Sequence, residues 1–346
     1  MKTYQLILAT ALVTLASCNK EEVTNTDVNL ESNEIGFNVV NRKATKANDA
    51  IISGTTYATD NTFQVWGWQS KEGDFSEFSD DDASNFMTNL TISWTGGRDS
   101  RTEAWRNAAN YYYWPFNGKI SFLALHPSTV APSTTGWDAT NDKPKATVAD
   151  YTISAANKTV DLMFATNEGS RRADALPMVF NHALSQIEVQ VKTDEDYTAD
   201  VAFDVESVTF NNIDLSGDLA YANNAFTWTD NAAQTASWTY YDTVLEDITK
   251  DYQVYGAANV MIPQAASVAD DPATTDAIEG SYLTIGYSME QTGSAKITGT
   301  VNISKPQAWE AGKKYVYTLN FRLNEILFNP SVTDWVTVNV DTINIF

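Results

Sequence analysis

Few side chains in this sequence could carry covalent or acid–base chemistry. Cys18 is the only cysteine, and His126 and His182 are the only histidines. A thiolate is a nucleophile or a metal ligand, and a histidine is the usual general base near neutral pH. No G-x-S-x-G nucleophile elbow, phosphate-binding P-loop or H-E-x-x-H zinc motif accompanies them. The sequence therefore predicts neither a nucleophilic enzyme nor a zinc hydrolase.

The carboxylates are numerous but form no catalytic or metal-binding pattern. The chain has 44 Asp and Glu residues, among which a glycosidase would need one pair flanking the sugar bond. No pair stands out, and the acidic runs 80–82 and 194–196 lack the spacing of a calcium-binding EF-hand loop. We therefore expect no catalytic residues, no cofactor and no metal, and we interpret these runs as solvated loops. We expect His182, just before a predicted strand, to be hydrogen-bonded scaffolding.

The chemistry of Cys18 is indicated by what precedes it. Lys2 gives a positive start, an apolar segment runs from 6 to 16, and small residues come directly before the cysteine. Residues 1–17 are thus predicted to be a secretory signal, with an apolar run shorter than the roughly 20 residues of a membrane span. The end of this segment resembles the bacterial lipobox, in which diacylglycerol alkylates the thiol. The alternative is an ordinary signal peptide followed by an incidental cysteine.

A lipid on Cys18 would anchor the mature protein to the outer membrane at the cell surface. Two or three acyl chains, at about 0.8 kcal/mol per buried CH₂, hold a protein durably, and palmitate is one such chain. Residues 18–33 contain too few apolar side chains to fold and are predicted to be a flexible tether. The acidic residues just behind the cysteine resemble the surface-export signal of Bacteroidetes lipoproteins.

Composition excludes some partners and indicates a large core. The formal net charge of −22 makes nucleic acid an unfavourable partner. Hydrophobic residues make up 43% of the chain, including 10 Trp, 16 Tyr and 15 Phe, which is ample material for a core without disulfides. The length of 346 residues favours two domains.

Period-two hydrophobicity predicts β-strands along the whole chain. Ile35, Phe37 and Val39 alternate with more polar or small residues, and the same alternation marks 90–94 and 187–191. Further strands are predicted at 62–68, 119–125, 149–153, 160–165, 203–210, 281–289, 297–303 and 314–323. Only 236–249 leaves room for a short helix. The pattern predicts an all-β protein of antiparallel β-sandwiches, divided within 167–178 into units of residues 34–172 and 173–346.

Several segments, in their order and spacing, resemble one family over nearly the whole mature chain. They combine aromatic residues before strands with small-residue turns: 112–115, 120–124, 161–165, 180–185, 208–213, 217–219, 262–264, 309–315 and 332–335. The resemblance is to the Bacteroidales fimbrillin family, the FimA-type and Mfa-type subunits of type V pili. It implies two transthyretin-like, Greek-key β-sandwiches in a non-enzymatic fimbrial subunit that is exported as a lipoprotein precursor.

The same resemblance implies assembly by strand exchange with other fimbrial subunits. An arginine-specific protease would remove the strand that holds Ile35, Phe37 and Val39, and a neighbour's strand would fill the groove. Arg42 is the nearest arginine, and Lys46 (with Lys43) is a departure from the expected cut site.

The candidate donor strand is the tail 336–346. Its apolar residues fall on two faces, with Val336, Val338 and Val340 on one and Ile343 and Ile345 on the other. A break near Asp341 is therefore expected. The alternative is that the tail is simply the last edge strand of the C-terminal sandwich.

A second function remains open from the sequence: a surface lipoprotein that binds host glycans or proteins and never polymerises. Trp66, Trp68 and Tyr111 to Tyr113 could form a sugar-stacking platform, although packing in the core is the more common role of such residues.

Overall fold

The computed structural model describes residues 33–41, 57–95, 104–197, 201–230, 236–265, 280–304, 308–322 and 326–334. Several predicted residues lie outside these ranges: Cys18 with the signal and most of the tether, Arg42 and Lys46 at the cut site, and Val336, Val338, Val340, Ile343 and Ile345 of the tail.

The described residues form twenty strands and no helix, so the prediction of an all-β fold is confirmed. In chain order the first ten strands are β1 (Phe37–Asn41), β2 (Thr62–Ser70), β3 (Met87–Thr95), β4 (Ala104–Arg106), β5 (Lys119–His126), β6 (Thr134–Asp138), β7 (Lys143–Thr152), β8 (Met163–Gly169), β9 (Leu176–His182) and β10 (Ser185–Thr193). The other ten are β11 (Val201–Ile213), β12 (Ser216–Ala222), β13 (Ala225–Asp230), β14 (Ala236–Tyr241), β15 (Gln253–Val254), β16 (Asn259–Met261), β17 (Tyr282–Gln291), β18 (Ile297–Ser304), β19 (Lys313–Phe321) and β20 (Ile326–Asp334).

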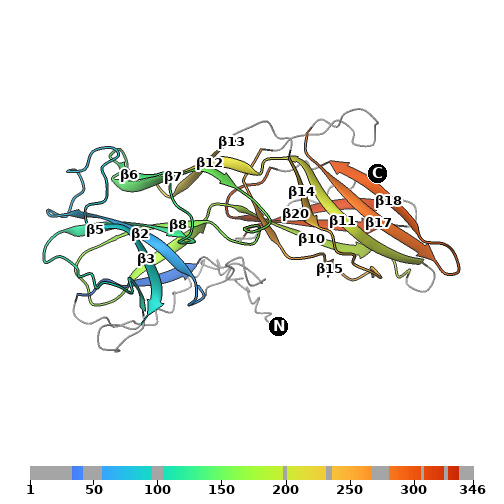
Figure 1. Cartoon of the computed structure of the whole chain (residues 1–346), viewed down its shortest axis with the longest axis horizontal. Coiled ribbons are helices and arrows are strands. Elements are labelled where there is room, and N and C mark those ends of the chain that lie inside the picture. Colours follow the sequence, from blue (N-terminus) through green and yellow to red (C-terminus); the bar gives the residue numbers. More distant parts are fainter. Residues whose placement is uncertain are drawn as a thin grey trace, which may run out of the picture.

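One end of the molecule is a closed barrel, in the strand order β1-β4-β3-β2-β5-β8-β9 (Figure 1). β1 closes it by pairing in parallel with β9 and antiparallel with β4. Aromatic rings fill the interior, among them Phe63, Phe122 and Phe180. Gly118, at a φ of 87°, allows the turn into β5, where a Cβ would meet the Ser70 carbonyl oxygen at 2.0 Å.

The other end is a sandwich of two sheets with the orders β15-β10-β19-β20 and β14-β11-β17-β18, in which β16 extends the first sheet beside β10. Ring contacts join the two sheets: Phe210 of β11 lies 5.4 Å from Tyr317 of β19, and Phe203 lies 6.0 Å from Phe321. The β10–β19 pair is parallel and the β19–β20 pair is antiparallel.

A fourth sheet, β13-β12-β7-β6, combines strands from distant parts of the chain and lies along the top of Figure 1. It covers the outer face of the barrel, where Phe164 of β8 stacks on Tyr221 of β12 at 4.8 Å. β2 and β5 are buried on both faces as a result. Because β7 pairs with β12, and β9 pairs with β1 and β8, strands on both sides of residue 172 share sheets. The division into units at that residue stays a prediction.

The structure also shows strands that the sequence pattern did not predict. They are β4, β6, β9, β12, β13, β14, β15, β16 and β20. Within 236–249, the segment in which the sequence left room for a short helix, Ala236–Tyr241 is a strand.

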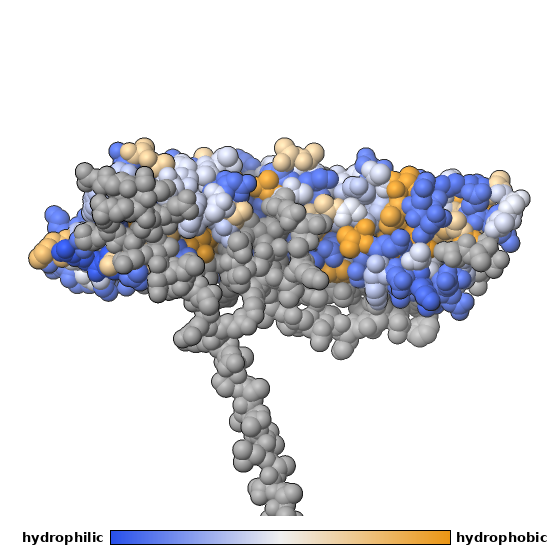
Figure 2. Space-filling view, turned by 90° about the horizontal axis from the view of Figure 1, so that it is seen from below, coloured by the Kyte–Doolittle hydropathy of each residue, from blue (hydrophilic) through white to orange (hydrophobic). Residues whose placement is uncertain are grey.

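Among the coloured residues in Figure 2, hydrophilic ones predominate and hydrophobic ones lie in small separate groups. In the described part of the chain, no helix has the length and hydropathy of a membrane span.

Candidate functional site

The candidate functional site consists of the first strand, β1, and the two strands that pair with it, β4 and β9. β1 aligns five residues with β9, whereas it aligns only Phe37 with Trp105 of β4. The chain just before β1 is held by backbone hydrogen bonds: the Ile35 amide donates to the Tyr112 carbonyl at 2.7 Å, and the Trp114 amide donates to the Asn33 carbonyl at 2.7 Å. We call residues 33–41 the entry strand. Residues 33–37 are thus bonded on one side to the 112–114 segment and β4, and residues 36–41 are paired on the other side with β9.

Three apolar side chains of the entry strand enter the barrel, as their alternation predicts. Ile35, Phe37 and Val39 are 3%, 1% and 8% exposed. The Phe37 ring packs edge-on against Phe122 at 5.2 Å and Phe63 at 6.1 Å. Since successive strand residues point to opposite faces, these three side chains form one row in the barrel core. Withdrawal of the strand would leave an apolar groove between β4 and β9.

A buried ion pair lies at the start of the entry strand. Arg106 of β4 donates from Nη1 to Oε1 of Glu34 at 2.7 Å, and the two side chains are only 3% and 5% exposed. Removal of one partner from a buried pair is strongly destabilising, because the other charge keeps its desolvation cost. Sequence reasoning missed this pair. The only local signal was an acid directly before an apolar row.

Exposed aromatic side chains surround the point where the entry strand begins. Tyr111 and Tyr113 are each 44% exposed and Phe116 is 81% exposed. The Arg171 guanidinium lies 5.5 Å from the centre of the Phe116 ring and also donates a hydrogen bond to Asn33 Oδ1. We call Tyr111, Tyr113 and Phe116 the aromatic rim.

The five aromatic residues of the predicted sugar-stacking platform do not form a common surface. Trp66 and Trp68 are buried, at 3% and 0% exposure, and pack in the core beneath the fourth sheet. Tyr112 packs against the barrel core, and only Tyr111 and Tyr113 are exposed. For the two tryptophans, the interpretation as core residues is confirmed.

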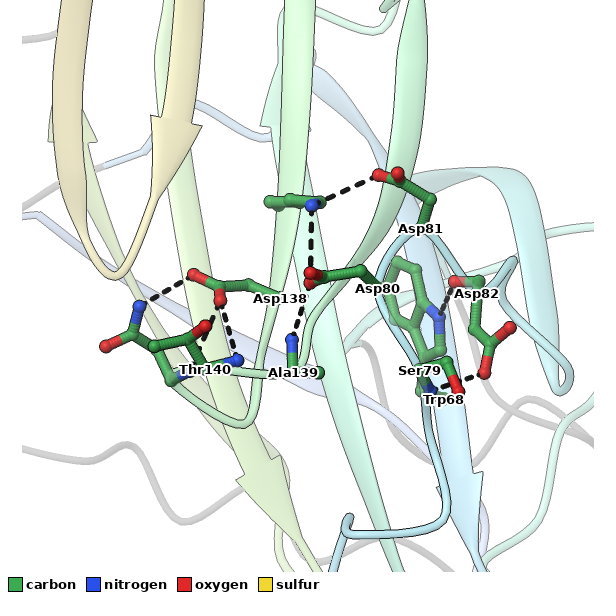
Figure 3. Close-up of polar contacts among 10 residues, drawn as sticks. Trp68, Ser79, Asp80, Asp81, Asp82, Asp138, Ala139 and Thr140 are labelled. Carbon is green, nitrogen blue, oxygen red and sulfur yellow. Dashed lines mark hydrogen bonds and ion pairs between the residues drawn. The ribbon is translucent and has the colours of Figure 1, made fainter.

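The acidic run 80–82, in the loop after β2, contacts β6 and β7 of the fourth sheet (Figure 3). The Lys145 ammonium lies 3.1 Å from Asp81 Oδ1 and 3.6 Å from Asp80 Oδ1. Asp80 also accepts the Ala139 amide, and the Asp82 carbonyl accepts the Trp68 indole N–H at 2.8 Å. These bonds fasten the loop after β2 to β6 and β7.

Close backbone contact explains how this loop approaches β6. A Cβ on Gly136 would lie only 2.9 Å from the Asp81 Cα, so glycine is needed there.

In the turn after β6, the hydrogen bond from the Asn141 side chain holds the pKa of Asp138 below its ordinary value. Within the described residues, no three His, Cys, Asp or Glu side chains converge as a metal site would require.

Both histidines are buried at the ends of barrel strands and hold structural contacts. The Tyr57 hydroxyl and His126 Nδ1 lie 2.6 Å apart, and both reach the Thr62 carbonyl. Burial lowers the pKa of His126 below its ordinary value. His182 Nδ1 lies 2.5 Å from Oδ2 of the buried Asp161. This matches the scaffolding role expected for His182.

Comparisons with known proteins agree with this architecture. The chain is similar in fold to a fimbrial protein from Bacteroides vulgatus ATCC 8482, at a TM-score of 0.60 and 18% identity over 88% of this chain and 100% of that one. It is also similar to a candidate cell adhesion protein from Bacteroides uniformis ATCC 8492, at a TM-score of 0.51 and 16% identity over 88% of this chain and 98% of that one. A search of the curated proteins finds no match.

The sequence itself assigns the family. Residues 42–335 match the family model described as fimbrillin-like, which covers most of the chain. With the all-β architecture described above, the match establishes that the chain belongs to the fimbrillin-like family.

Proposed function

We propose that this protein is a cell-surface fimbrial subunit that contributes to adhesion and is assembled by protease-triggered strand exchange. Family membership supports the fimbrial role. The observation that carries the mechanism is the entry strand, which closes the barrel and fills its core with Ile35, Phe37 and Val39. A segment at the beginning of the chain can be cut away without severing the rest of the fold.

The position of the proposed cut fits this role. β1 ends at Asn41. Cleavage after Arg42 would therefore release the complete strand, whereas cleavage at Lys46 would need a protease of different specificity. The vacated groove would expose unpaired backbone groups of β9 and an apolar floor, which together are the features that bind an added strand.

We propose that the donor is the tail 336–346 of a neighbouring subunit. Val336, Val338 and Val340 repeat the period-two row of the entry strand. Subunits linked in this way form a chain in which each tail fills the next barrel.

Deletion of residues 340–346 tests the proposal. After treatment with an arginine-specific protease, the full-length chain should form ladders on unheated gels, whereas the truncated chain should stay monomeric with a melting temperature within a few degrees of the parent. The control is the untreated full-length chain, in which the entry strand still occupies the groove. Ladders from the truncated chain would reject the tail as donor.

We propose further that Cys18 carries lipid, so that the precursor reaches the cell surface anchored in the outer membrane. The support is the lipobox-like sequence before this cysteine. Cells fed an alkyne analogue of palmitate should label the wild-type chain, and Cys18→Ser should lose the label completely because it lacks the thiol. Equal labelling of both chains would reject this site.

We propose also that the C-terminal half folds as a transthyretin-like, Greek-key β-sandwich. The sandwich formed by β10, β19 and β20 against β11, β14, β17 and β18 supports a transthyretin-like, Greek-key unit in the C-terminal half. A glycan-binding protein that does not polymerise stays the alternative function. The burial of Trp66 and Trp68 leaves only Tyr111 and Tyr113, of the five aromatic residues considered for sugar stacking, on the surface.

A further inference from the structure

The Glu34–Arg106 pair sets a condition on any strand that replaces the entry strand. Arg106 belongs to β4 and stays in the barrel, whereas Glu34 leaves with the entry strand. The 2.7 Å hydrogen bond between them would then be lost at a site where both side chains are almost completely buried. A replacement that supplies only apolar side chains would leave the guanidinium without this carboxylate, which is unfavourable in a buried site.

The entry strand itself shows which side chains a replacing strand must supply, and at which spacing. In the entry strand an acid, Glu34, is followed at the first, third and fifth positions beyond it by Ile35, Phe37 and Val39. The acid points to one face of the strand and the three apolar residues to the other. A well-matched donor must repeat this order and spacing.

The tail satisfies the pattern in only one direction. Read from the C-terminus backwards, Asp341 is followed at the first, third and fifth positions by Val340, Val338 and Val336. Read forwards, Asp341 is followed at those positions by Thr342, Asn344 and Phe346, and Asp334 is followed by Trp335, Thr337 and Asn339. Neither forward reading gives three apolar residues.

We propose that Arg106 selects the incoming strand by pairing with Asp341 of a second copy of this chain. The tail then enters the groove in the direction opposite to the entry strand. Val340, Val338 and Val336 take the places of Ile35, Phe37 and Val39. This inference rests on the proposed strand exchange and specifies the register, direction and charge of the donor.

The same register gives the second apolar set of the tail a place of its own. Beyond Asp341, the donor runs past the position of Asn33, where the Trp114 amide is bonded and Arg171 reaches across to Phe116. Ile343 and Ile345 therefore extend over the aromatic rim of Tyr111, Tyr113 and Phe116, which the single chain leaves exposed. The apolar residues of the tail change from one face to the other at Asp341–Thr342, which is the point where the tail would pass from the groove to the aromatic rim.

Two tail variants with the same change in charge test the role of Asp341. Asp341→Asn and Asn344→Lys each raise the net charge by one, but only the first removes the carboxylate from Arg106. After arginine-specific cleavage of the full chain, we measure the concentration of monomer that remains at equilibrium with polymer. Asp341→Asn should raise it at least about 30-fold, the effect of losing one partner of a buried charge pair. Asn344→Lys should stay within about threefold of wild type.

A second experiment changes the ion pair in the barrel that accepts the tail. Glu34→Gln with Arg106→Gln replaces the ion pair with a neutral pair of similar size, and thermal unfolding checks that the precursor still folds. In this background Asp341→Asn should no longer weaken assembly. The tail variants alone remain decisive if the double variant does not fold, because they leave the barrel unchanged.

Cysteine pairs test the direction. Val40 pairs with Val179 of β9, which is 37% exposed, and in the proposed register residue 335 takes the place of Val40. Val179→Cys combined with Trp335→Cys should give disulfide-linked subunits, whereas Val179→Cys with Asp341→Cys should not. The native Cys18 leaves with the cleaved segment.

The possible results distinguish the role of Arg106 from strand exchange itself. If wild type polymerises and Asp341→Asn does so equally well, or if Asn344→Lys is impaired as strongly, the role of Arg106 is rejected and strand exchange stands. Linkage through residue 341 would reject the direction. Failure of the wild-type chain to polymerise would reject strand exchange and this inference together.

Discussion

Trp68→Ala should lower the free energy of unfolding by about 3–5 kcal/mol, the usual cost of truncating a large buried aromatic residue. Trp68 is fully buried, and its ring lies 6.0 Å from Trp137 of β6. Its indole N–H donates to the Asp82 carbonyl at 2.8 Å. The substitution thus opens a cavity and removes a bond that holds the acidic loop against the fourth sheet. Chemical denaturation followed by tryptophan fluorescence and circular dichroism measures the change.

Tyr111→Ala is the matched control for this prediction. Tyr111 is also an aromatic residue of the first half of the chain, but it is 44% exposed. Its replacement should change the free energy of unfolding by less than about 1 kcal/mol, as is usual for surface positions. A Trp68→Ala protein as stable as the Tyr111→Ala protein would show that the fourth sheet does not depend on this contact.

Phe37→Ala should destabilise the precursor by about 3–5 kcal/mol and leave the assembled polymer unaffected. The Phe37 side chain is 1% exposed and contacts two other rings of the barrel core. In the proposed strand exchange the entry strand is cut away before assembly, so the polymer would lack the substituted residue. Scanning calorimetry of the precursor and heat resistance of the gel ladders give the two measurements.

The polymer formed from the same variant is the internal control. Equal heat resistance of the wild-type and Phe37→Ala polymers is expected if the tail of a neighbour has replaced the entry strand. Polymers destabilised to the same degree as the precursor would mean that Phe37 is still present in them, and would contradict strand removal.

Sequence reasoning succeeded where one face of a strand is buried and the pattern is regular. The row of Ile35, Phe37 and Val39 was recognisable because alternation is the direct signature of a half-buried strand. The same logic located the strands at 187–191 and 281–289, which correspond to β10 and β17.

Prediction failed where a strand is built from residues that give little strand signal. β7 spans Lys143–Thr152, but only its end was predicted. The missed part, 143–148, alternates regularly in burial, yet its buried positions include Pro144 and Ala146, which are uncommon in strands. β12 contains Gly217, Ala220 and Ala222, which give little strand signal of their own.

The polar half of the candidate site could not be predicted from local sequence. Glu34 and Arg106 are 72 positions apart and come together only because β4 pairs with the entry strand. β4 has three residues, which are too few for a periodic signal. The exposed position of the aromatic rim is likewise set by the path of the loop between β4 and β5.

The way the sheets share strands has a consequence for export. A chain that crosses a membrane from its N-terminus presents β1 first, but β1 must wait for β9, and the β6–β7 pair must wait for β12 to continue its sheet. No complete barrel with its covering sheet exists until residue 230 has emerged. Pairings between such distant segments form slowly, and unpaired strand edges are prone to aggregate meanwhile. If the chain is exported as proposed, strand edges of its first half therefore stay unpaired until about two thirds of it has crossed.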